Sequence, residues 1–105
     1  MFYEDVFRAL NETDVHYIVA GGLAVNLHGV PRMTQDLDIQ LHMNQSNITA
    51  AIKALRELGY ESRLPVDPKQ FADPEKRQEW IDKKDMKAFT MVHETKDLRQ
   101  VDFLF

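Results

Sequence analysis

The sequence predicts a small α/β or α+β domain in which helices pack on a mixed β-sheet. Helical and strand-like segments are interleaved along the chain, which is typical of such folds. Alternating or β-branched apolar residues mark four strand candidates, at residues 15–20, 36–42, 86–93 and 101–105. Apolar residues at helical spacing mark four helix candidates, at residues 2–11, 23–28, 46–58 and 74–84. A length of 105 residues suits one domain, residues 1–105.

The ends of these segments carry recognisable signals. We expect residues 15–20 to form a buried strand, because the run is short, apolar and partly β-branched. Ser46 or Asn47 is suited to cap the helix that follows, and Gly59 is suited to end it. Residues 60–85 show little pattern apart from the helix expected near their end.

The last two strand candidates flank a short polar connection, residues 94–100, which predicts antiparallel neighbours. The chain stops within the final strand, so either the sheet is minimal or the sequence has been cut short at its C-terminus. A final strand of that kind suggests pairing across a homodimer.

Composition excludes several functional classes. The chain has no cysteine, which rules out disulfides, thiolate zinc sites and a cysteine nucleophile. A net charge of −4 argues against a general nucleic-acid coat. The acidic N-terminus is unlike a signal peptide, and no apolar run approaches the roughly 20 residues that span a bilayer. We therefore expect a cytoplasmic protein with no membrane segment.

Two aspartates share one face of the most regular strand candidate. Polar and apolar residues alternate strictly over residues 36–42, so Asp36 and Asp38 project on the same side, about 6.6 Å apart. Two like charges this close repel unless a cation lies between them. Magnesium favours carboxylate oxygens together with substrate phosphates. The other interpretation is a solvated surface pair, which Asp-x-Asp commonly is.

Two further features complete a candidate site. Gly21 and Gly22 lie between a strand and a helix, where backbone N–H groups can hold a phosphate; a tight turn is the alternative. Asp102 is a single acid in an apolar strand, where a charge is costly unless it is paired or bound to metal. It is therefore a third ligand, a salt-bridge partner of Arg99, or an edge residue.

Together, Ala20-Gly21-Gly22, Asp36-Leu37-Asp38-Ile39 and Val101-Asp102 resemble the DNA polymerase beta-like nucleotidyltransferase superfamily. Residues 19–29 and 32–38 are similar to its abortive-infection-type and uncharacterised bacterial branch, and more distantly to antibiotic adenylyltransferases. The resemblance implies a polymerase beta palm-like core.

The resemblance also implies roles for the candidate residues. Asp36 and Asp38 would hold two Mg²⁺ ions, with Mn²⁺ as an alternative. Asp102 would complete the site of the ion that activates the acceptor hydroxyl and would take its proton. Gly21 and Gly22 would contact the β- and γ-phosphates of a nucleoside triphosphate such as ATP.

Arginine, threonine and histidine residues near the paired aspartates are further candidates for the site. Arg32 suits phosphate geometry but equally suits an ion pair that holds the loop. Thr34 is suited to a phosphate contact or, rather better, to capping the approach to the strand. The four histidines are scattered with no i, i+4 pair, which argues against zinc, although His42 shares a face with the paired aspartates.

The leading hypothesis is a metal-dependent nucleotidyltransferase that moves a nucleoside monophosphate to an acceptor hydroxyl and releases pyrophosphate. The acceptor, which the sequence does not identify, is a small molecule, a protein or an RNA. The alternative is a non-catalytic regulatory or interaction protein of the same fold, such as a toxin–antitoxin component bound to a partner protein. A third interpretation is a plain α/β domain whose acids bind nothing.

Overall fold

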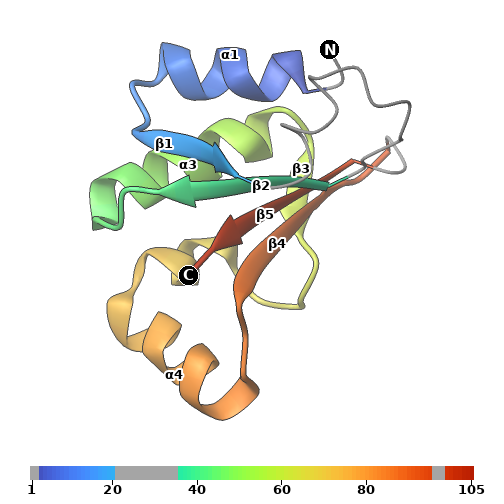
Figure 1. Cartoon of the computed structure of the whole chain (residues 1–105). Coiled ribbons are helices and arrows are strands. Elements are labelled where there is room, and N and C mark those ends of the chain that lie inside the picture. The colour runs from blue at the N-terminus through green and yellow to red at the C-terminus, as the bar shows by residue number, and fades with distance from the viewer. Residues whose placement is uncertain (1–2, 21–35, 96–98) are drawn as a thin grey trace.

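The computed structural model describes residues 3–20, 36–95 and 99–105. Its strands are β1 (Tyr17–Ala20), β2 (Asp36–Leu41), β3 (Tyr60–Ser62), β4 (Ala88–His93) and β5 (Gln100–Leu104). Its helices are α1 (Glu4–Glu12), α3 (Gln45–Glu57) and α4 (Pro74–Lys84), with a 3-10 helix η1 (Pro68–Ala72) before α4. These residues form the expected α+β architecture (Figure 1).

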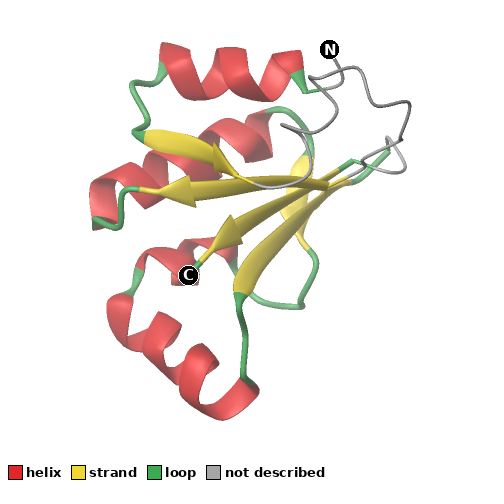
Figure 2. Ribbon diagram, in the orientation of Figure 1, coloured by secondary structure: helices red, strands yellow, loops and turns green. Residues whose placement is uncertain are grey.

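The strands form one sheet in the order β1-β2-β5-β4-β3 (Figure 2). Strands β2 and β5 run parallel, and the other neighbouring pairs are antiparallel. The predicted mixed sheet is therefore confirmed. So is the predicted antiparallel pairing of the last two strands, with Ala88 opposite Leu104 and Val92 opposite Gln100.

One face of the sheet forms the core. Alternate residues of the three central strands point to it and are completely buried, namely Leu37, Ile39, Phe89, Met91, Val101 and Phe103. Helices α1 and α3 cover this face near β1 and β2, contributing Leu10 and Ile48. At the β4 end, Phe71 of η1 and Trp80 of α4 stack on Phe89. The intervening polar residues consequently point to the opposite face.

Strand β1 is an edge strand, so the expectation that it is buried was wrong. It pairs only with β2 among the described strands. Ile18 is consequently 66% exposed and Val19 is 37% exposed. An apolar run shows that a strand can be buried, but its place in the sheet decides whether it is.

Strand β5 is a central strand, which corrects the suggestion that it pairs across a dimer. It lies between β2 and β4 and is bonded to both. Both of its backbone edges are therefore already used, and none is left for a second chain.

Helix α3 begins slightly earlier than expected, because Asn44 is its cap. The Asn44 side chain accepts a hydrogen bond from the Asn47 backbone N–H at 2.7 Å. The expected ending at Gly59 is confirmed: its φ of +99° suits glycine, and an added Cβ would lie 2.8 Å from Nε2 of His93.

The Asn47 side chain ties α3 to the β1–β2 hairpin. Its Oδ1 accepts from the His16 backbone N–H at 2.8 Å. Its Nδ2 donates to the carbonyls of His16 and His42, each at 2.9 Å. Asn47 is 7% exposed while His16 and His42 are exposed residues, so these bonds are partly shielded from water.

The unpatterned segment between Gly59 and α4 contains β3 and η1, neither of which was predicted. The predicted helix at 23–28 lies outside the described residues. No described helix is both long enough and apolar enough to cross a membrane.

Candidate active site

The structure brings Asp38 and Asp102 together on the polar face of the sheet. They are direct partners across the parallel pair β2–β5. Neighbouring strands lie about 4.8 Å apart, so the two side chains project side by side. Asp36, opposite Gln100, lies one step along the same face. Strand alternation alone predicted that Asp36 and Asp38 share a face. The pairing of β2 with β5 places Asp102 beside them.

The charges of these acids act on one another. Burial raises the pKa of Asp38, and the Asp102 charge, a hydrogen bond to Asp102 and the Asp36 charge raise it further. These effects favour a proton or a cation between the carboxylates. The proximity of the negative carboxylates therefore destabilises the folded protein at neutral pH, and a bound cation would offset this repulsion.

Asp102 is held by two polar side chains that the sequence did not identify. Thr90 Oγ1 donates to Asp102 Oδ1 at 2.7 Å. Gln100 Nε2 lies 3.2 Å from Asp102 Oδ1 and 3.4 Å from Oδ2. Thr90, a polar residue in the predicted strand 86–93, was a signal for this network, whereas Gln100 had been assigned to the polar connection 94–100. The register of β4 and β5 was needed to place both.

The start of β5 is fixed by Tyr3, which precedes α1, and by Asp5 in the first turn of α1. The Tyr3 hydroxyl donates to the Gln100 carbonyl and accepts from the Gln100 N–H, both at 3.1 Å. Arg99 forms an ion pair with Asp5 at 3.0 Å, whereas a salt bridge to Asp102 was one of the predicted alternatives. These contacts hold the strand that carries Asp102 in register.

The residues present fit a magnesium ion. Among the described residues, no three or more His, Asp or Glu side chains are placed so that together they could hold a metal ion, so Asp36, Asp38 and Asp102 do not form a ready-made three-acid site. Mg²⁺ does not need such a site, since it is commonly held by one or two carboxylates plus substrate phosphates. The paired oxygens of Asp38 and Asp102 match that requirement.

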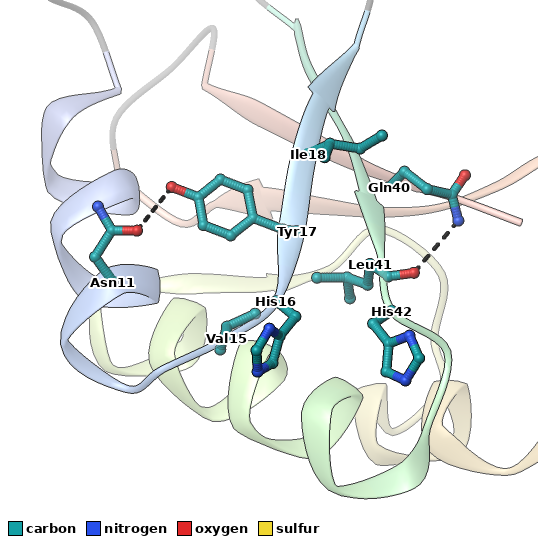
Figure 3. A pocket seen from close by; sticks show the side chains of 8 residues that line it. All are labelled: Asn11, Val15, His16, Tyr17, Ile18, Gln40, Leu41 and His42. Atoms are coloured by element: carbon teal, nitrogen blue, oxygen red, sulfur yellow. Dashed lines mark hydrogen bonds between the residues drawn. The ribbon is translucent and has the colours of Figure 1, made fainter.

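A separate open pocket of about 690 Å³ lies against β1 and β2, and none of the three aspartates lines it (Figure 3). Gln40 and His42 line it, two and four residues beyond Asp38 on the same face. At about 3.3 Å per residue, His42 lies roughly 13 Å along the strand from Asp38. His42 therefore borders this pocket rather than the acids. Figure 3 shows the His16 and His42 rings pointing to the same end of the hairpin.

The remaining predicted site residues, Gly21, Gly22, Arg32 and Thr34, lie outside the described residues.

Comparison with known proteins identifies the family. A family model for aminoglycoside-2''-adenylyltransferases matches residues 3–102. The chain belongs to this family. The match spans all three site aspartates and supports nucleotidyl transfer as the class of chemistry, consistent with the superfamily resemblance. The narrower abortive-infection-type branch is not confirmed. Neither curated proteins nor solved structures gave a significant match.

In this family member, Asp38→Asn should stabilise the metal-free protein at neutral pH. The folded state binds the Asp38 proton more tightly than the unfolded chain, because the pKa is raised from 3.8. This tighter proton binding stabilises the folded state fully below pH 3.8, and the stabilisation is lost as the pH rises through the raised pKa of Asp38. Asparagine carries no charge, so we expect a gain of about 0.5 kcal/mol, or roughly 2–4 °C in melting temperature.

Thermal unfolding in EDTA from pH 3 to 8 measures this effect. The gain should shrink as the pH falls toward 3.8. Glu94→Gln is the control, because Glu94 is exposed and lies outside the helices, so that removing its charge does not alter a helix end. A destabilised Asp38→Asn variant at pH 7 would contradict the prediction.

Proposed function

We propose that this protein transfers a nucleoside monophosphate from a nucleoside triphosphate to an acceptor hydroxyl and releases pyrophosphate. The observation that carries the proposal is the in-register pairing of Asp38 with Asp102 on a polar sheet face, with Asp36 beside them. The family match supports the same class of chemistry.

The proposed reaction is a displacement at the α-phosphorus. The acceptor oxygen forms a bond to this phosphorus, the bond to the bridging oxygen breaks, and pyrophosphate leaves. Mg²⁺, the expected ion, would neutralise phosphate charge when held by Asp38 and Asp102, with the predicted ligand Asp36 one step along the same face. Asp102 would accept the hydroxyl proton, and the remaining catalytic effect would come from positioning.

The donor and acceptor follow from the family name as proposals. It indicates ATP as the donor and the 2''-hydroxyl of an aminoglycoside as the first acceptor to test. Gly21, Gly22, Arg32 and Thr34 remain the residues that we propose to contact the triphosphate.

Titration calorimetry with a non-hydrolysable ATP analogue tests the nucleotide site. We expect binding by the wild type only when Mg²⁺ is present, loss of this binding in Asp38→Asn, and retention in Asp85→Asn. Mass spectrometry of an aminoglycoside panel incubated with ATP then tests transfer. Absence of magnesium-dependent binding by the wild type would overturn the proposal. Binding without transfer to any acceptor would favour the non-catalytic alternative.

A further inference from the structure

Asp102 is held asymmetrically, and the asymmetry distinguishes its two oxygens. Oδ1 receives the short Thr90 bond of 2.7 Å and the Gln100 amide at 3.2 Å. Oδ2 lies 3.4 Å from the same amide nitrogen, which is a weaker contact. Apart from the Asp38 contact described above, Oδ1 thus has two close donors among the described residues, and Oδ2 has the greater capacity to accept another group.

The two donors reach Asp102 from different directions. Thr90 lies directly opposite it on β4, as its antiparallel partner. Gln100 precedes it by two residues on the same face of β5. Thr90 and Asp102 are both partly buried, so their bond is partly shielded from competing water. A carboxylate bonded from both sides loses freedom of rotation about its side-chain torsions.

Gln100 is itself held in place. Its backbone N–H and carbonyl both bond to the Tyr3 hydroxyl. Thr90 is β-branched, which restricts its own side-chain rotation. The Thr90 side chain and the Gln100 backbone are therefore restrained before they meet the carboxylate, and restrained outer partners are what orient acidic ligands toward a metal or substrate.

We propose that Thr90 and Gln100 are positioning residues that hold the Asp102 carboxylate in one rotamer, with Oδ1 occupied and Oδ2 presented for the reaction. The inference rests on the proposed function for its catalytic consequence, although the restraint itself is independent of any ligand. Thr90 is the principal restraint, since its bond is the shorter.

The first test measures the Asp102 rotamer in the metal-free protein, from NMR three-bond couplings to its β-protons. We expect one χ1 rotamer in the wild type and averaging in Thr90→Val, which keeps the shape but removes the hydroxyl. Thr90→Ser should restore one rotamer, and Gln100→Leu should give partial averaging. Thr95→Val is the control, because Thr95 is exposed and lies after the end of β4, five residues beyond Thr90. A single, unchanged rotamer in both Thr90→Val and Gln100→Leu would overturn the proposal.

The second test measures Mn²⁺ affinity by electron paramagnetic resonance titration. Loss of an outer partner typically weakens metal affinity about 10–100-fold, so we expect roughly a 10-fold loss in Thr90→Val. We expect Thr90→Ser to remain near the wild type. Equal affinity in wild type and Thr90→Val would contradict the positioning role toward metal. If the wild type binds no Mn²⁺ while the rotamer still averages in Thr90→Val, the restraint stands and the proposed function fails.

Discussion

Asp102→Asn should reduce the rate of nucleotidyl transfer by about 10²–10⁴-fold, the range lost when a positioned acid–base group is removed. Asparagine has nearly the same shape, and its side-chain oxygen can still accept from Thr90. It cannot take up the acceptor proton, and it carries no charge to hold a cation beside Asp38. The loss should therefore fall on the chemical step and on metal binding, with the fold preserved.

Pyrophosphate release at saturating ATP and acceptor measures this prediction. Circular dichroism and melting temperature should show that Asp102→Asn stays folded. Asp85→Asn, a change of the same chemistry on an exposed acid, should keep the wild-type rate. A rate for Asp102→Asn within about 3-fold of wild type, far below the expected range, would exclude Asp102 from the reaction.

Local patterns predicted part of this site because they depend on neighbouring residues alone. Strand alternation has a period of two, so Asp36 and Asp38 had to share a face wherever the strand lay. Thr90 and Gln100 were different. Their contact with Asp102 depends on how β4 and β5 are aligned, and a one-residue slip would turn every side chain to the other face.

Sheet order was likewise beyond local reasoning. The runs at 15–20 and 101–105 looked similarly apolar, yet one formed the exposed edge strand β1 and the other the central strand β5. Strand β5 enters between β2 and β4, and this insertion both buries it and sets Asp102 beside Asp38. The site therefore results from long-range pairing that no short motif encodes.

The cap of α3 shows the same limit at a smaller scale. Asn44, Ser46 and Asn47 are all good capping residues by type. The structure uses Asn44 for the cap, bonds Ser46 to the Asn44 side chain at 2.9 Å, and directs Asn47 to the β1–β2 hairpin. Which asparagine caps the helix was decided by the strands that pack against its first turn.

Asn47→Ala should consequently be among the most destabilising polar substitutions in the chain. It removes one acceptor and one donor group and leaves the His16 N–H and the His42 carbonyl without their side-chain partner. Unsatisfied buried groups cost about 1–3 kcal/mol each. Because these bonds are only partly buried, we expect a total loss of about 2 kcal/mol in the free energy of unfolding. The melting temperature should fall by roughly 8–16 °C.

Urea unfolding followed by circular dichroism measures the loss. Ser46→Ala is the matched control, because Ser46 lies on the same helical turn, is exposed, and bonds only to the cap side chain among the described contacts. We expect it to change stability by no more than about 0.5 kcal/mol. If Asn47→Ala were as mild as this control, the buried side chain would not be what joins α3 to the hairpin. A large loss would instead show that the β1–β2 hairpin, and with it the strand carrying Asp36 and Asp38, depends on a single amide from the adjoining helix.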